Sequence, residues 1–102
     1  MKKKERPTYD LDEIKRLLLN EESRHVTQSA RLEAVKLRYA DDDEMVQRCL
    51  QLTMRNFDKT MPSEKCPGLM QDVYFTYDGP RKIYIKFQIS NGKGIIISFK
   101  ET

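Results

Sequence analysis

The sequence lacks most of the side chains from which metal centres and disulfide-stapled folds are built. It contains no tryptophan, one histidine (His25) and two cysteines, Cys49 and Cys66, in unrelated contexts. This set supplies neither a four-ligand zinc site nor a disulfide framework, and it fits a reducing compartment. The single histidine also excludes nucleases that use two histidines as acid and base. We therefore expect no metal ion and no other cofactor.

Long apolar runs and glycine-rich loops are missing as well. No segment approaches the roughly 20 apolar residues of a membrane span. Basic residues 2–4 are followed by polar residues instead of the apolar core of a signal peptide. Gly92 and Gly94 stand in a turn between two strand-like runs, so they do not form a phosphate-binding loop. The expected location is the cytoplasm, with no membrane partner.

The 102 residues suffice for one small domain, in which charge is unevenly distributed. The net charge is only +3, but residues 81–102 carry five basic side chains against one acidic, and residues 1–6 carry four against one. A basic end on a slightly acidic body points to an anionic partner, with nucleic acid the first candidate. We predict a single domain over residues 1–102, with residues 1–9 as a flexible basic tail.

The order of the patterns predicts helices first and strands afterwards. Capping residues and apolar spacing indicate helices over residues 11–20, 27–39, 41–50 and 54–59. The buried face of the second should be Ala30, Ala34 and Leu37. A short strand at residues 24–26 is an open alternative to a plain connection, and residues 70–77 have strand composition. Together with a terminal hairpin this gives an α+β domain with a mostly antiparallel sheet.

Four acidic residues, 41–44, open the third helix. They complement the positive end of that helix, and carboxylates adjacent on a helix point in different directions, so we interpret them as structural and not as a metal site.

The C-terminal residues 82–100 predict a β-hairpin. Residues 82–89 and 94–100 each alternate apolar and polar side chains, and Asn91-Gly92 lies between them. A two-residue turn would mix the two faces, so we predict a three-residue loop, residues 90–92, with Gly92 left-handed beside a bulge. In this register Tyr84 and Lys100 share the polar face. The expected apolar face of the last strand is Ile95, Ile97 and Phe99.

The polar face of the hairpin is rich in lysine around Tyr84. A solvated face that protects the sheet from aggregation explains this pattern without any function, and pattern alone favours that explanation. The alternative is RNA cleavage by the neighbouring 2′-hydroxyl, which needs no metal. Ordinary pKa values of tyrosine and lysine, about 10, are far from neutral. Crowding Lys82, Lys86 and Lys100 on one face would lower the pKa of at least one of them.

Several segments, in their order and spacing, resemble the MqsR family, the motility quorum-sensing regulator toxins. The resemblance covers nearly the whole chain from the first helix onward. Its segments are Leu52-Thr53, Phe57, Lys59-Thr60-Met61, Gln71-Asp72-Val73-Tyr74, Ile83-Tyr84-Ile85-Lys86 and Ile97-Ser98-Phe99-Lys100-Glu101.

The resemblance implies a RelE-like fold and a bacterial type II toxin that cleaves mRNA without a metal ion, in some members at GC-containing triplets such as GCU. It also implies a cognate antitoxin, similar to MqsA, that blocks the toxin. By motif, the functional residues fall on Lys59, Gln71, Tyr84 and Lys100.

Within this interpretation each residue has an expected role. Tyr84 transfers a proton, with a neighbouring lysine lowering its pKa, while Lys59 and Lys100 stabilise the phosphorane. Gln71 orients a base or phosphate, and Lys82 and Lys86 contact phosphates. The alternative is a non-catalytic module that binds nucleic acid or a protein partner with the same basic face.

Overall fold

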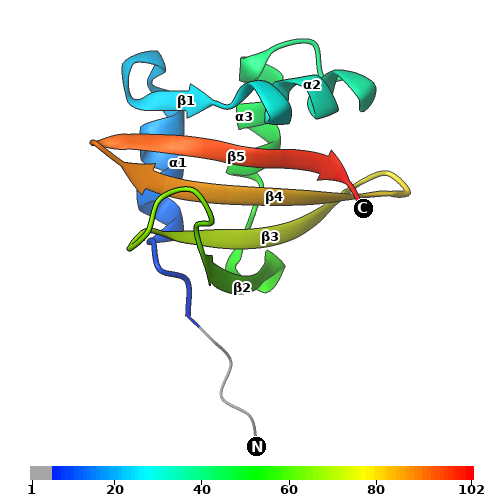
Figure 1. The fold of residues 1–102 in the computed structure, drawn as a ribbon. Coiled ribbons are helices and arrows are strands. Elements are labelled where there is room, and N and C mark those ends of the chain that lie inside the picture. Colours follow the sequence, from blue (N-terminus) through cyan, green and yellow to red (C-terminus); the bar gives the residue numbers. More distant parts are fainter. Residues whose placement is uncertain (1–5) are drawn as a thin grey trace, which may run out of the picture.

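In the computed structural model, which describes residues 6–102, helices cover one face of a five-stranded sheet (Figure 1). The strand order is β1-β5-β4-β3-β2, and only β1 and β5 are parallel. The strands are β1 (Arg24–Val26), β2 (Phe57–Pro62), β3 (Met70–Asp78), β4 (Arg81–Ser90) and β5 (Lys93–Glu101). The α+β prediction is confirmed. The alternative of a short strand at residues 24–26 is confirmed as β1, whereas β2 was not expected from the sequence.

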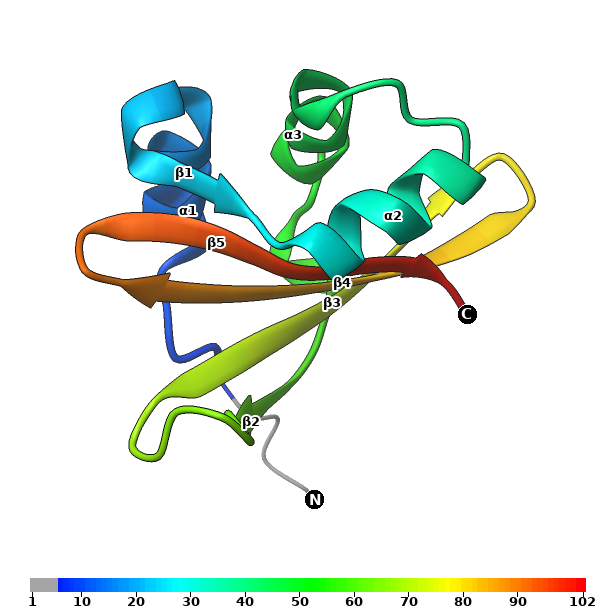
Figure 2. The same cartoon turned by 45° about the horizontal axis from the view of Figure 1, so that its top comes forward.

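Two helices, α1 (Leu11–Leu19) and α3 (Asp42–Leu50), pack on the core face of the sheet. The third helix, α2 (Gln28–Lys36), runs instead along β5, beyond the end of the short β1 (Figure 2). Short 3₁₀ turns, η1 (Glu21–Ser23) and η2 (Met54–Asn56), precede β1 and β2. No helix within residues 6–102 has the length and apolar character needed to cross a membrane.

Helix α2 starts where predicted but ends early. The Thr27 side chain caps it by accepting a hydrogen bond from the Ala30 N–H, and Ala30, Ala34 and Leu37 are buried as expected. The helix stops at Lys36 instead of Tyr39, because Arg38 takes a left-handed conformation (φ 70°) and Tyr39 N–H returns to the Ala34 carbonyl at 3.0 Å. A left-handed residue closing the last turn is a common helix terminus.

The expected helix over residues 54–59 is wrong after its first turn. Thr53 and Asn56 form a capping box around η2, and the chain then becomes strand β2. The physical reason is tertiary: Phe57 is 4% exposed and packs its ring 5.5 Å from that of Tyr74, which commits the following residues to pairing with β3. Lys59 therefore lies on strand β2 and not at the end of a helix.

The predicted hairpin exists, but its turn and its bulge differ from the prediction. Ser90 pairs with Lys93 across a two-residue turn in which Asn91 and Gly92 both have positive φ (54° and 72°). Asn-Gly suits this turn because both central residues must be left-handed. The bulge lies further along, where the register shifts between Lys86 and Phe87.

This register shift keeps the apolar and the polar side chains of the hairpin on separate faces, whereas a two-residue turn without a bulge would put both kinds on each face. Because of the extra residue in β5, Ile96 is fully buried in the core while Ile97 lies on the opposite face, so the expected inward positions of Ile95 and Ile97 are wrong. Beyond the bulge, Tyr84 pairs directly with Lys100, so the prediction that the two residues share a face is confirmed.

The segment before α1 is tied to the sheet. The backbone N–H groups of Thr8 and Tyr9 both donate to the buried Asp72 carboxylate, at 2.9 and 2.8 Å. The predicted flexible tail therefore does not extend to these two residues, and residues 1–5 lie outside the described part of the chain.

Candidate functional site

The sheet face opposite α1 and α3, called the open face below, carries the chemistry. Cross-strand pairing places Lys59, Val73, Lys86 and Ser98 in one row across β2, β3, β4 and β5. A second row two residues along joins Phe75, Tyr84 and Lys100. Directly paired residues share a face, as do residues two apart on one strand. The two rows therefore form a single patch.

The predicted site residues meet on this patch, each from a different strand. Lys59 comes from β2, Gln71 from β3, Tyr84 from β4 and Lys100 from β5. Gln71 lies two residues from Val73 and pairs with Met61, which is itself two residues from Lys59. Four lysines of the open face, Lys59, Lys82, Lys86 and Lys100, are called the basic cluster below.

The basic cluster forms no ion pairs in the described part of the chain. Within residues 6–102, none of its four ammonium groups has a carboxylate within ion-pair distance. Two of them lie over aromatic rings instead. The Lys82 Nζ is 4.5 Å from the centre of the Phe75 ring, and the Lys100 Nζ is 5.1 Å from that of Tyr84. These cation–π contacts hold the side chains in place without neutralising them.

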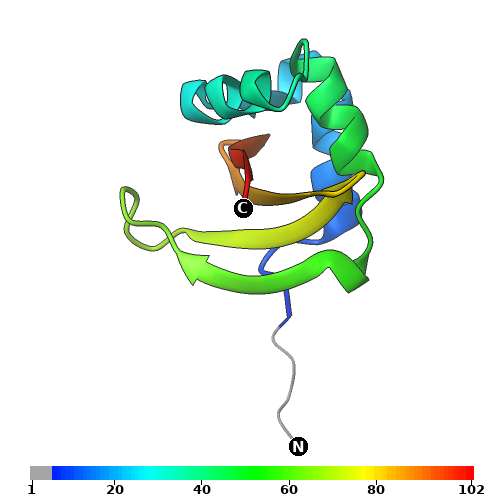
Figure 3. The same cartoon turned by 90° about the vertical axis from the view of Figure 1, so that its right-hand side faces the viewer.

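A groove of about 320 Å³ opens on the same face, next to the first row. Its floor consists of Gln71, Lys86, Gln88, Met61 and Ile97. Its walls are the start of α2 (Thr27 and Ser29) and the loop after β2 (Ser63, Glu64, Lys65 and Cys66). Figure 3 shows that α2 and this loop project to the same side of the sheet, away from α1 and α3.

Lys86, at the boundary between the groove and the basic cluster, has a perturbed pKa. Burial lowers the pKa of Lys86, and the charges of Lys100 and Lys59 lower it further, while the Glu64 carboxylate acts in the opposite direction. The predicted effect of lysine crowding is confirmed in direction. The largest cause of the lowered pKa is burial. Among the lysines, Lys59 contributes to it in place of Lys82, which was expected to.

The predicted effect on Tyr84 is wrong. The pKa of Tyr84 is raised, first by burial and then by the negative charge of Asp58. Its ring packs edge-on against Phe75 (centroids 5.5 Å apart), and the Lys100 ammonium lies over the ring. The phenol is therefore protonated at neutral pH, as a proton donor must be.

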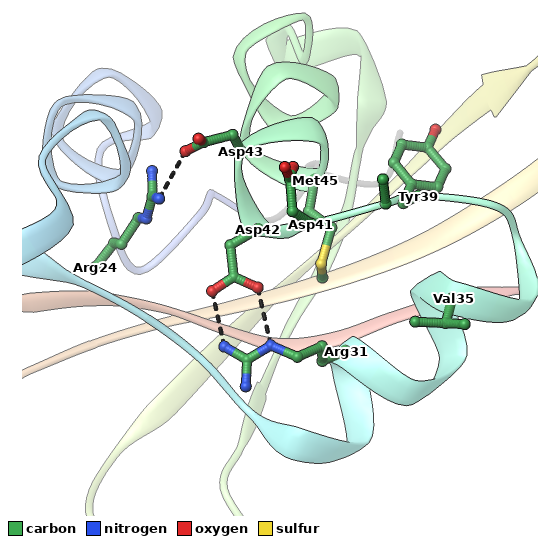
Figure 4. A pocket seen from close by; sticks show the side chains of 9 residues that line it. Arg24, Arg31, Val35, Tyr39, Asp41, Asp42, Asp43 and Met45 are labelled. Atoms are coloured by element: carbon green, nitrogen blue, oxygen red, sulfur yellow. Dashed lines mark hydrogen bonds and ion pairs between the residues drawn. The ribbon is translucent and has the colours of Figure 1, made fainter.

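A second hollow, of about 400 Å³, lies between α2 and α3 on the other side of α2 (Figure 4). Its charges satisfy one another. Arg31 donates two hydrogen bonds to Asp42, at 2.9 and 2.7 Å, and Arg24 donates to Asp43 at 2.7 Å. Asp41 caps α3 by accepting from the Glu44 N–H at 2.9 Å. The acidic residues therefore build the helix start, and no grouping of metal-binding side chains occurs among residues 6–102.

The alternation along residues 82–89 predicts that Gln88 lies on the polar face of its strand, but it indicates no role for this residue. In the structure Gln88 is 5% exposed and accepts a hydrogen bond from the Gln71 side chain at 3.0 Å. Because Gln88 alternates with Tyr84 and Lys86 along the strand, the sequence was enough to predict which face of the sheet it occupies. The groove itself could not be foreseen, because its walls come from α2 and from a loop remote in sequence.

A protein-family model described as "Motility quorum-sensing regulator, toxin of MqsA" matches residues 6–101, nearly the whole chain. A comparison with curated proteins gave no significant match.

Proposed function

The chain belongs to the MqsR family, the toxins of MqsA, and from this premise we propose that it is a metal-independent endoribonuclease that cleaves mRNA. As the toxin of a toxin–antitoxin system it has an antitoxin as its partner. We propose that cleavage arrests growth in the bacterial cytoplasm until an MqsA-like antitoxin binds. A preference for GC-containing sites such as GCU stays a prediction.

One observation carries this proposal. Four candidate residues, contributed one each by four strands, share an open face with the basic cluster, whose charges have no counter-ions among the described residues. Unpaired like charges repel one another, so such an arrangement favours a polyanionic ligand. A groove beside the cluster offers room for an unstacked base, as single-stranded RNA recognition requires.

The proposed reaction has three needs: a base for the 2′-hydroxyl, positive charge at the phosphorane and an acid for the leaving 5′-oxygen. Lys86 suits the first need, because its lowered pKa gives it more of the neutral amine that can accept a proton. This assignment replaces the expected role of Lys86 as a phosphate contact only.

The remaining roles follow from charge and protonation. Lys59 and Lys100 flank Lys86 and stabilise the phosphorane. Tyr84 stays protonated and gives its proton to the 5′-oxygen as the P–O bond breaks. Lys82 contacts a neighbouring phosphate. The products are a 2′,3′-cyclic phosphate and a 5′-hydroxyl, with the proton that Lys86 accepts balanced by the one that Tyr84 gives up.

The test is purified protein on a defined mRNA in EDTA, with mapping of the cut sites and of the end chemistry. Cleavage that leaves cyclic phosphate ends is expected. If Tyr84→Phe and Lys100→Ala both cleave at the wild-type rate, the site assignment is wrong.

A non-catalytic binding module is the second candidate, because the same unpaired lysines would hold RNA without cutting it. Expression without antitoxin separates the two. A nuclease arrests growth and Lys59→Ala or Lys100→Ala relieves the arrest, whereas a binding module leaves growth unchanged.

A further inference from the structure

We propose that Gln88, together with Gln71, forms a subsite that reads one nucleobase of the RNA, at a nucleotide next to the cleaved bond. The inference rests on the proposed function and adds to it a specificity-determining residue, Gln88, that the motif residues do not include.

The two side chains form a nearly buried polar pair on the groove floor. Gln71 is 7% exposed and Gln88 is 5% exposed, and the Gln71 Nε2 donates to the Gln88 Oε1 at 3.0 Å. Buried glutamine is uncommon, because an amide removed from water costs free energy unless all its polar atoms find partners. Two such residues side by side therefore call for an explanation.

Two of the four polar side-chain atoms of the pair have no hydrogen-bond partner among residues 6–102. Each amide has an acceptor oxygen and a donor NH₂ group. Among the described residues no group donates to the Gln71 Oε1 and none accepts from the Gln88 Nε2, and neither atom is fully enclosed by protein. Exchanging the oxygen and nitrogen of both amides reverses their roles but still leaves one acceptor and one donor.

One acceptor beside one donor matches the edge of a base. Every base carries a donor next to an acceptor on its Watson–Crick edge, and single-stranded RNA is read at such edges. The order of the two groups differs between bases: adenine and cytosine present the donor first, from the exocyclic amino group, whereas guanine and uracil present the acceptor first, from the exocyclic oxygen. An amide pair held in one orientation therefore matches one order and leaves the other unsatisfied. The groove is near the lower limit of ligand-pocket volumes, about 300 Å³, and is lined by apolar side chains, Met61 and Ile97, that suit the faces of a flat ring. A phosphate group would be held by the ammonium groups of the basic cluster in preference to the two neutral amides.

The position of the pair fixes which nucleotide it reads. Gln88 lies two residues from Lys86 on β4, a separation of roughly 7 Å along a strand. A phosphate held between Lys86 and Lys100 thus leaves an adjoining base within reach of the amides.

The pair should discriminate strongly, because a wrong base leaves buried amide atoms without partners. Sites that match a polar edge reject mismatched ligands far better than apolar pockets do. The discrimination expected from one well-matched amide contact to a base is roughly tenfold or more.

The experiment uses a random-sequence RNA pool and compares the bases around the cut sites of four proteins. Wild type should show a strong preference at one position next to the cut. Gln88→Leu, which keeps the volume but removes the amide, should reduce that preference roughly tenfold and leave the other positions unchanged. Gln88→Glu keeps the acceptor for Gln71 but replaces the donor with an acceptor, so the preferred base should change. Gln47→Leu, on an exposed position of α3, should match wild type.

Each result has a distinct meaning. If Gln88→Leu is folded, as judged by its melting temperature, and cuts with the wild-type base profile, the inference is overturned while the nuclease proposal stands. If wild type cuts no RNA, the nuclease proposal fails. The inference is then judged by binding of non-cleavable 2′-O-methyl trinucleotides. Shifts of the Gln71 and Gln88 side-chain amide NMR signals that depend on the base would support it, and unmoved signals would refute it.

Discussion

The two surfaces on either side of α2 differ in whether their charged side chains form ion pairs. In the hollow between α2 and α3, Arg31 and Arg24 are paired with Asp42 and Asp43 at 2.7 Å. On the open face the basic cluster gathers four lysines with no ion pair in the described part of the chain. Arginine and aspartate side chains line the first surface, whereas the second gathers lysines beside aromatic and amide side chains.

We interpret the paired arginines and aspartates as structural, and the unpaired lysines as available to bind a ligand. A paired surface charge adds up to about 1 kcal/mol of stability and needs nothing more. Burial lowers the pKa of Lys86, the most buried of the four lysines, and repulsion from Lys100 and Lys59 lowers it further. An anion bound at this face would relieve the repulsion.

The largest effect that would test this contrast is on catalysis. Lys100→Ala should lower the cleavage rate roughly 100- to 1,000-fold, the usual cost of removing one group that stabilises transition-state charge. The melting temperature should hardly change, because Lys100 is exposed and has no ion-pair partner among residues 6–102. Single-turnover cleavage of a defined RNA in EDTA measures the rate. Arg31→Ala, from the paired hollow, is the matched control and should cut normally.

The next effect concerns the pH dependence of cleavage. If neutral Lys86 is the base, activity rises with pH as its ammonium loses a proton. The Glu64 carboxylate raises the pKa of Lys86 against the other influences on it. Glu64→Gln should therefore move the rise to lower pH and increase activity on the acid side by less than an order of magnitude. The readout is the pH profile of kcat/KM.

Two variants check the sign of that shift. Lys59→Met removes a like charge that lowers the pKa of Lys86, so the rise should move to higher pH, whatever the loss of absolute rate. Glu22→Gln, an exposed carboxyl on η1, should leave the profile in place. If the pH profile moved in the same direction in all three variants, or did not move in Glu64→Gln, a group other than Lys86 would be the base.

Local patterns in the sequence predicted the open face and the lowered pKa of one of its lysines, but not the raised pKa of Tyr84. Alternation along β4 placed Tyr84, Lys86 and Gln88 on one side, because strand periodicity depends on nothing beyond the strand itself. The raised pKa of Tyr84 was missed because it reflects burial and Asp58, which another strand brings near. Similarly, the contact between Gln71 and Gln88 exists only in the register that β3 and β4 adopt.

The hairpin shows a second limit on sequence-based prediction. The conflict between a two-residue turn and the two faces was visible in the sequence, and a bulge was the right kind of solution. The position of the bulge could not be predicted, because an extra residue can be accommodated anywhere along the two paired strands. Packing decided it: Ile96 fills the core, and Ile97 is left on the open face as part of the groove. Strand β2 was missed for a related reason, since the burial of Phe57 overrides the local helical signal.

A smaller effect separates phosphate contacts from catalysis. Lys82→Ala should weaken RNA binding uniformly across sequences and reduce the slope of log Kd against log salt by roughly 0.7, the value for one lost contact to a single strand. Titration of a non-cleavable RNA at several salt concentrations measures the slope. Lys93→Ala, at the exposed hairpin turn, should change it less. Equal slopes for Lys82→Ala and wild type would remove Lys82 from the RNA-binding surface.

The smallest effect belongs to the paired hollow. Arg31 and Asp42 are partly exposed (side chains 50% and 28%), so a double-mutant cycle with alanine should give a coupling free energy below about 1 kcal/mol. Hydrogen bonding from Arg31 lowers the pKa of Asp42. The coupling is therefore fully present above the unfolded-state pKa of an aspartate, about 3.9, and is lost as pH falls through the lower folded-state value. Urea unfolding at pH 7 and in acid measures both. RNA cleavage by the two single variants should equal wild type. A loss there would show that this hollow, too, serves the ligand, and the contrast between paired and unpaired charge would no longer locate the site.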